Sequence, residues 1–233
     1  MTRLDRRSFL GAGLLGAAGL TSCGAFSARG AFAQALAETP RVGEGPFFPD
    51  ELPRDTDNDL LLLNDDLTPA VGTITHVSGR VLSRAGEPLR NACVELWQAD
   101  SRGSYLHSDG ASAEGRDANF QGYGRFLTGR RGDYYFRTIH PVPYRGRAPH
   151  LHVAVSHNGA RVLTTQLGVA GYHGNDDDGV FRSLSRAERD RLMVRYQPVP
   201  GSGVGEVAGS LDLVVGHTPE ERDGAMVASN RGR

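Results

Sequence analysis

The sequence has few cysteines and no excess of charge of one sign. Its 233 residues include two cysteines, and 26 basic side chains against 27 acidic ones give a formal net charge of −1. Neither sign forms a long run that would attract nucleic acid or a membrane surface. Stability must therefore come from a packed core rather than from a disulfide framework, and a small molecule is a better candidate partner than a nucleic acid.

The chain also lacks a hydrophobic run long enough to be a convincing membrane span. The apolar stretch over residues 11–20 is short and rich in Gly and Ala, and it follows the pair Arg6-Arg7. That order is typical of a twin-arginine export signal. We assign residues 1–33 to this signal and expect a periplasmic or extracellular protein.

Two processing routes remain open for this signal. Residues 31–33, Ala-Phe-Ala, form a small-residue cleavage site, which we favour. After that cleavage only Cys93 would remain, and no intrachain disulfide could form. Residues 20–23 resemble a lipobox, and lipidation of Cys23 would instead give the domain a lipid anchor. The twin-arginine route exports folded proteins, often with a cofactor bound, which favours a cofactor site.

Short β-branched and aromatic runs recur along the middle of the chain, separated by turns rich in the 31 glycines and 12 prolines. We predict an all-β fold, an antiparallel β-sandwich with long loops, in one domain over residues 34–217. Residues 218–233 are a polar tail. The predicted strands are Thr73–Ser83, Ala92–Gln98, Asp133–Ile139, His150–Ser156, Val162–Val169 and Leu211–Val215.

One short accessory helix is expected within this pattern. Ser185 is a suitable N-cap, and Glu188 three residues later completes a capping box. We expect the helix to continue through Arg189–Tyr196. Residues 122–124, Gly-Tyr-Gly, are interpreted as a turn only. No internal repeat or phosphate-binding glycine motif is present, so nucleotide binding is not supported.

The pattern His150-Leu151-His152 lies in a predicted strand. Side chains two residues apart in a strand point to the same face, so both imidazoles can reach one metal ion. The pair alone is equally compatible with a polar sheet face. Tyr144 in a proline-rich turn and Tyr105 after another strand add two phenols, although each alone could be an ordinary packing aromatic.

Five separated segments carry a family resemblance that extends from about Gly43 to Asp178. These segments are Glu44–Phe48, Val94–Asp100 with Tyr105, Asn119–Arg125, Tyr135–Tyr144 and Arg147–His152. In this order they resemble the intradiol ring-cleavage dioxygenases, the family of protocatechuate 3,4-dioxygenase and catechol 1,2-dioxygenase. Several separated motifs must coincide, which makes the resemblance specific.

The resemblance implies a non-haem iron(III) dioxygenase that uses O2 to cleave catechol-type rings between the two hydroxylated carbons, giving muconate-type products. It implies that Arg147 is a catalytic and substrate-binding residue and that Gln166 binds substrate. Phenolates are hard, strongly donating ligands that favour iron(III). The implied iron ligands are Tyr105, Tyr144, His150 and His152.

Several alternatives stay open at this point. A transthyretin-like β-sandwich could use the same strands for binding alone, without needing all four ligands, and a zinc hydrolase would need a water-activating base. Phe47 and Phe48 follow Glu-Gly-Pro where relatives often carry tyrosine, so the sequence does not decide which catechol is preferred. A homo-oligomer is also possible. The run Asp176–Asp178 is interpreted by default as a solvated loop, and Cys93 as a buried small hydrophobe.

Overall fold

The computed structural model describes residues 35–63, 68–112 and 115–217. The assignments of residues 1–33 to an export signal and of 218–233 to a tail lie outside these residues. Within the described ranges, no helix is both long and apolar enough to cross a membrane.

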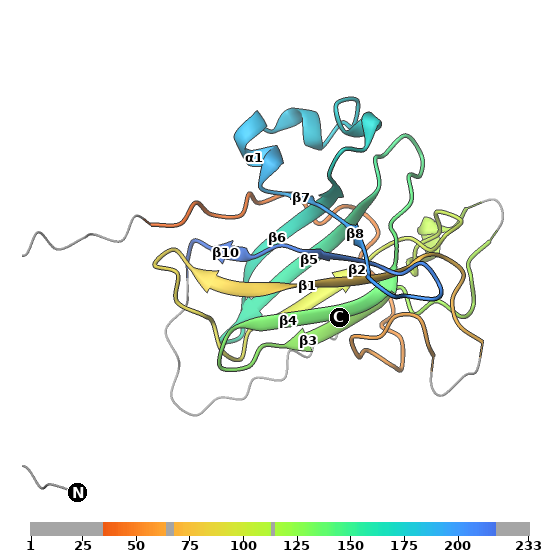
Figure 1. Ribbon diagram of the computed structural model, residues 1–233, viewed down its shortest axis with the longest axis horizontal. Coiled ribbons are helices and arrows are strands. Elements are labelled where there is room, and N and C mark those ends of the chain that lie inside the picture. The colour runs from red at the N-terminus through yellow and green to blue at the C-terminus, as the bar shows by residue number, and fades with distance from the viewer. Residues whose placement is uncertain (1–34, 64–67, 113–114, 218–233) are drawn as a thin grey trace, which may run out of the picture. The chain divides into compact units, whose positions relative to one another are not determined.

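Two five-stranded sheets form a sandwich-like fold (Figure 1). In the first sheet, β1 lies between β4 on one side and β9 and β10 on the other, and β8 pairs with β9. The second sheet has the order β3-β2-β5-β6-β7. The strands of the first sheet are β1 (Ile74–Ser83), β4 (Asp133–Ile139), β8 (Gln197–Pro198), β9 (Val207–Ser210) and β10 (Leu213–Val215). Those of the second are β2 (Cys93–Trp97), β3 (Tyr123–Leu127), β5 (His150–His157), β6 (Ala160–Val169) and β7 (Met193–Val194).

The predicted all-β sandwich is confirmed, but the sheets are mixed rather than purely antiparallel. β1 pairs in parallel with β9 and with β10, and β6 pairs in parallel with β7. Parallel neighbours cannot be joined by a tight hairpin and need a long connection. The connection between β6 and β7 carries the 3-10 turns His173–Asn175 and Phe181–Ser183 and the helix α1 (Arg186–Asp190).

The predicted helix start is confirmed and its end is wrong. The Ser185 side chain accepts from the backbone N–H of Glu188, and the Glu188 carboxylate accepts from the backbone of Ser185, which completes the capping box. The helix ends at Asp190 and does not continue to Tyr196. Residues 193–194 instead pair with the edge of β6, because the alternating Leu192 and Val194 are fully buried in the core.

Six predicted strands appear as β1, β2, β4, β5, β6 and β10, whereas β3, β7, β8 and β9 were not predicted. β3 was missed because Gly122-Tyr123-Gly124 was interpreted as a turn. Gly124 serves packing instead, since a Cβ added there would lie 2.7 Å from Cδ1 of Leu60. Glycine therefore allows the loop around Leu60 to lie directly against this edge strand.

The core lies between the two sheets and depends on period-2 alternation. Val94 and Leu96 of β2 and Leu151 and Val153 of β5 are almost fully buried there. Burying each such side chain contributes about 1.5–3 kcal/mol. The alternate residues of β2 and β5 therefore point to the outer face of the second sheet, where long loops cover one end (Figure 1).

We predict that Gly79→Ala destabilises the fold by about 1–3 kcal/mol in urea unfolding. A Cβ at Gly79 of β1 would clash with the backbone carbonyl of Leu211 and lie 2.9 Å from Cε1 of Tyr134. Gly203→Ala is the matched control, because a Cβ there meets no atom within 4 Å. Equal midpoints for the two variants would contradict the described packing of β1.

Candidate metal centre

The two histidines of β5 face each other on the outer face of the second sheet. Both side chains are buried, and their Nε2 atoms are 3.2 Å apart. Nδ1 of His150 lies 2.7 Å from the carbonyl oxygen of Ala148. A carbonyl only accepts, so Nδ1 carries the proton and Nε2 of neutral His150 presents a lone pair towards His152.

Tyr105 brings a phenol oxygen to the same point. Its hydroxyl oxygen is 3.1 Å from Nε2 of His152 and 3.5 Å from Nε2 of His150. The buried carboxylate of Asp100 holds the segment after β2, because it accepts hydrogen bonds from the backbone N–H groups of Ser104 and Asp117. These bonds fix the turn that carries Tyr105 over the sheet.

Tyr144 lies on a two-residue hairpin beside the histidines. Its backbone N–H and C=O exchange hydrogen bonds of 3.3 and 2.7 Å with Arg147. The two residues between them have φ values of 45° at Arg145 and 77° at Gly146, as a type I′ turn requires. The hairpin places the Tyr144 ring 5.5 Å from the His150 ring and 5.1 Å from the Tyr105 ring, centroid to centroid.

The structure therefore brings together all four side chains that were predicted as metal ligands. Two donors that each lie about 2.1 Å from one ion are about 3 Å apart when they subtend a right angle. The donor atoms of Tyr105, His150 and His152 are separated by 3.1–3.5 Å. Imidazole lone pairs at this distance repel each other unless a proton or a cation lies between them, so the set fits a metal ion.

Burial sets the protonation of this group. It lowers the pKa of His150 to about 4 and that of His152 well below its ordinary value, and Arg147 lowers both further. Burial also raises the pKa of Tyr105 well above its ordinary value and raises that of Tyr144, which Arg147 partly opposes. All four groups are thus neutral at pH 7 without a cation. A bound cation reverses this preference for the phenols, which then lose their protons.

Arg147 and Gln166 lie together, as their predicted shared role requires. The terminal NH2 nitrogen of Arg147 donates to Oε1 of Gln166 at 2.7 Å, and its Nε donates to Oδ2 of Asp178 at 2.8 Å. The amide of Gln166 in turn donates to the carbonyl oxygen of Gly43 at 2.9 Å.

Asp178 corrects the interpretation of residues 176–178 as a solvated loop. Asp176 and Asp177 are exposed, but Asp178 is buried. Desolvation by burial raises its pKa, yet hydrogen bonds from Arg147 and from backbone N–H groups outweigh this and lower the pKa overall, so the buried group is anionic. Sequence reasoning missed this residue, because an acidic run beside glycine has the same local pattern whether or not one member is buried.

Aromatic side chains wall the site on the side of the loop over residues 43–50. Phe47 stacks on Tyr105 with ring centroids 5.2 Å apart, and Phe48 meets Trp97 edge-on at 5.1 Å. Trp97 stacks in parallel on His152 at 4.9 Å. The guanidinium of Arg145 lies 5.5 Å from the centre of the Phe47 ring. These contacts keep water from the buried side of the donor set.

A hollow of about 300 Å³ opens beside Tyr144 and Arg147. Tyr172, Gly174 and Asp177 also line it. The hollow approaches the donor set from the side on which Tyr144 is only partly buried. A small ligand in this hollow would meet Tyr144 and Arg147.

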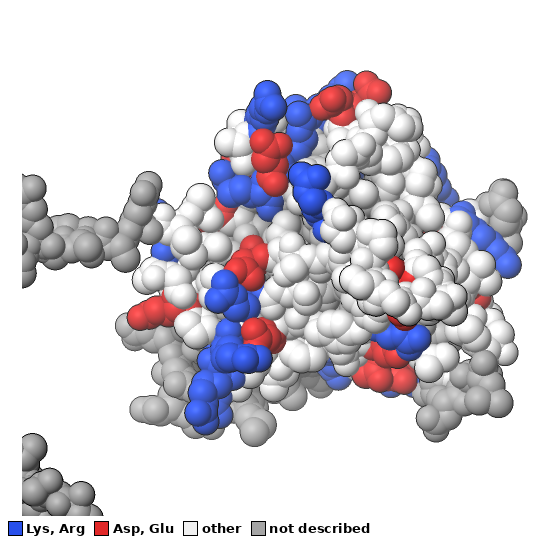
Figure 2. Space-filling model, in the orientation of Figure 1, with Lys and Arg blue, Asp and Glu red and all other residues white. Residues whose placement is uncertain are grey.

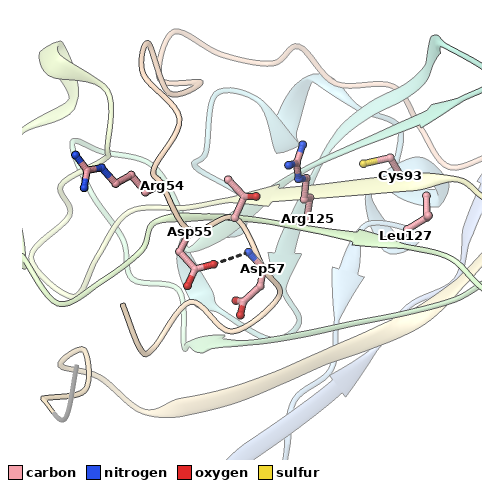
Figure 3. A pocket seen from close by; sticks show the side chains of 7 residues that line it. Arg54, Asp55, Asp57, Cys93, Arg125 and Leu127 are labelled. Carbon is pink, nitrogen blue, oxygen red and sulfur yellow. Dashed lines mark hydrogen bonds between the residues drawn. The ribbon is translucent and has the colours of Figure 1, made fainter. Parts of the chain in front are cut away.

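A second hollow, of about 570 Å³, lies elsewhere on the second sheet and contains none of the predicted metal ligands (Figure 3). Cys93 lines it together with Arg125 and Leu127 of β3. Cys93 is thus half-buried on the outer face rather than fully buried in the core, because Val94 is the residue that points inwards. Burial raises the pKa of its thiol, which keeps it protonated and unreactive.

Charged side chains of both signs are interspersed on the face of the described residues that Figure 2 shows. Ion pairs on the described surface include Arg80 with Asp212 and Arg189 with Asp176. The distribution agrees with the balanced composition and offers no basic stripe for nucleic acid on this face.

Comparison with known proteins gives the class and then the family. A family model described as a dioxygenase matches residues 43–215. The chain is 37% identical over 129 residues to the protocatechuate 3,4-dioxygenase beta chain of Burkholderia cepacia, a match that covers 52% of this chain and 54% of that one. It is 31% identical over 174 residues to catechol 1,2-dioxygenase of Acinetobacter baylyi, with 67% and 52% covered. The chain thus spans about half the length of these curated relatives.

Solved structures agree with this result. The dioxygenase domain of a dioxygenase carbohydrate-binding protein fusion from Streptomyces sp. SirexAA-E has a TM-score of 0.59 at 30% identity, with 77% of this chain and 99% of that chain covered. Catechol 1,2-dioxygenase from Acinetobacter sp. ADP1 has a TM-score of 0.57 at 25% identity, with 81% and 66% covered. The chain belongs to the intradiol ring-cleavage dioxygenase family.

We predict that Gly45→Ala weakens metal retention about tenfold in a chelator competition. A Cβ at Gly45 would lie 3.3 Å from Cε1 of His152, and its φ of 76° strains an L side chain by about 1–2 kcal/mol. Gly43→Ala is the control in the same loop, since a Cβ there meets nothing within 4 Å. Equal metal affinity in both variants would show that this loop does not set the position of His152.

Proposed function

We propose that this chain is a non-haem iron(III) dioxygenase that cleaves catechol-type rings between their two hydroxylated carbons. The observation that carries the proposal is a buried cluster in which the phenol oxygen of Tyr105 and two imidazole nitrogens lie within 3.5 Å of one another, with the Tyr144 ring directly beside it. Among the described residues, no three His, Cys, Asp or Glu side chains form a group that could hold a metal. A zinc hydrolase or an iron(II) site of two histidines and a carboxylate is therefore a poorer fit.

The donor chemistry supports iron(III) as the cofactor. Phenolate oxygens are hard anions, and two of them offset most of the charge of a trivalent ion. Tyr105, Tyr144, His150 and His152 would hold it. When bound, such an ion would bind both oxygens of a catechol and make the ring reactive towards O2.

The two tyrosines differ in a way that suggests separate roles. Tyr105 is buried and lies within 3.5 Å of both imidazole nitrogens, whereas Tyr144 is partly exposed and lies on a two-residue hairpin next to the hollow. Of the two tyrosines that would hold the metal, Tyr144 is the one placed to meet an incoming catechol. Its phenolate Oη would accept a proton from a substrate hydroxyl.

Arg147 places a permanent positive charge beside the electron-rich ring. Its charge acts on the pKa of all four predicted ligands, so it lies close enough to stabilise negative charge that develops on the substrate. Gln166 fixes one end of the guanidinium. In this proposal it would contact the substrate from the same side.

We also propose that the protein is exported and meets lignin-derived or other extracellular phenols, either free in the periplasm or medium or through a lipid on Cys23. The twin-arginine pattern of residues 1–33 supports export. A similar dioxygenase domain is part of a fusion with a carbohydrate-binding protein in a cellulolytic bacterium, which supports an extracellular role. Phe47 and Phe48 give the site an apolar wall, which favours catechols without an ionic group at that position.

We predict that Tyr144→Phe lowers the iron content of the purified protein at least tenfold. Losing a hydrogen bond to a metal ligand already lowers metal affinity about tenfold or more, and losing the ligand itself should lower it at least as much. Iron per chain is measured by metal analysis. Tyr135→Phe is the control. It removes the same hydroxyl group from a tyrosine that hydrogen-bonds to His76 on the first sheet, away from the donor set. Unchanged iron in Tyr144→Phe would remove Tyr144 from the ligand set.

The reaction itself is tested with ¹⁸O₂ and a panel of catechols. We expect a ring-opened dicarboxylic acid in which each new carboxyl group carries one labelled oxygen, detected by mass spectrometry. Arg147→Leu should reduce turnover while the iron is retained. Products with one labelled oxygen, or an aldehyde from cleavage outside the two hydroxylated carbons, would contradict the proposed reaction.

A further inference from the structure

Asp178 is a buried carboxylate to which the proposed reaction gives no task. It lies between β6 and α1, and its side chain has no exposed surface. Burying a charge is costly unless the charge is paired and hydrogen-bonded. Its neighbours Asp176 and Asp177 remain exposed, so the burial is specific to Asp178.

Both carboxylate oxygens of Asp178 are occupied by protein donors. Oδ2 accepts from Nε of Arg147 and from the backbone N–H of Ala148, each at 2.8 Å. Oδ1 accepts from the backbone N–H groups of Val180 at 2.9 Å and Phe181 at 3.0 Å. A carboxylate has about four lone-pair sites, so none remains for a metal or a substrate.

These bonds hold Arg147 at a second point. Gln166 accepts from one terminal nitrogen of the guanidinium, and Asp178 accepts from Nε. The guanidinium is planar, so two fixed nitrogens also fix the directions of its remaining N–H donors. With Gln166 alone, the plane could rotate about a single hydrogen bond.

We infer that Asp178 is the positioning residue that orients Arg147 towards the substrate, an inference that rests on the proposed dioxygenase function. Asp178 acts through Arg147 and does not touch the substrate. Turnover should therefore depend on Asp178 more strongly than iron retention does.

The test is a double-mutant cycle of Asp178→Asn and Arg147→Leu. Asp178→Asn should lower kcat/KM about 10–100-fold, the usual cost of losing a supporting hydrogen bond, with the iron absorption retained. In the Arg147→Leu background the same change should cost nothing further, because its effect passes through Arg147. Asp176→Asn is the matched control, since it removes the same charge from an exposed neighbour, and it should leave kcat/KM unchanged.

An equal loss from Asp178→Asn in both backgrounds would mean that Asp178 only stabilises the fold, and this would overturn the inference. If Asp178→Asn does not fold, Asp178→Glu keeps the charge and displaces it by one methylene. That variant should show a smaller loss, which again disappears in the Arg147→Leu background. A loss that persists there counts against the inference in the same way.

A second readout does not depend on activity. By NMR of the full chain loaded with diamagnetic gallium(III), the Nε–H of Arg147 should exchange slowly with solvent in the wild type and in Asp176→Asn, and at least tenfold faster in Asp178→Asn. Equally fast exchange in the wild type and Asp178→Asn would overturn the inference. Protection by Asp178 in a protein that cleaves no catechol would refute the proposed function and leave the positioning of Arg147 intact.

Discussion

The site depends on the contact between His150 and His152 at the start of β5. Strand alternation sends both imidazoles to the face away from the core, while Leu151 between them packs into the core. An outer sheet face normally meets water, yet both rings are buried, with Nε2 atoms 3.2 Å apart. Two neutral imidazoles in that arrangement need a cation or a shared proton between their Nε2 atoms. The rest of the site covers this pair and adds further donor atoms to it.

Three loops complete it, and hydrogen bonds to the backbone hold two of them. Asp100 secures the turn that carries Tyr105, and a type I′ hairpin carries Tyr144. The loop around Gly45 lies against His152. The ligands therefore come from segments far apart in sequence that the second sheet brings to one end. Asp178 and Gln166 then fix Arg147 at the rim, where the hollow opens.

Part of this was predictable from the sequence. The His-x-His pattern in a β-branched run is local information, and so is the capping box at Ser185, which was predicted correctly. Tyr105 and Tyr144 were not identifiable by local pattern, since each could be an ordinary aromatic; the family resemblance supplied them. The all-β class followed from short strands separated by turns.

The rest depends on contacts between distant segments. The parallel pairing of β1 with β9 and β10 is decided by long connections, which strand patterns do not encode. The helix ends early because β6 offers Val194 a pairing edge. Burial of Asp178 requires Arg147, 31 residues away, and nothing within the acidic run distinguishes it from its exposed neighbours.

The central claim is that two tyrosinates and two histidines hold iron(III) where a catechol can reach it. It is tested most directly by the visible absorption spectrum of the purified protein, with iron quantified per chain, before and after catechols are added without oxygen. The account predicts iron equal in amount to the chains and a red-brown tyrosinate-to-iron(III) band that shifts when a catechol binds. A protein that stays colourless after reconstitution with iron(III) would contradict it.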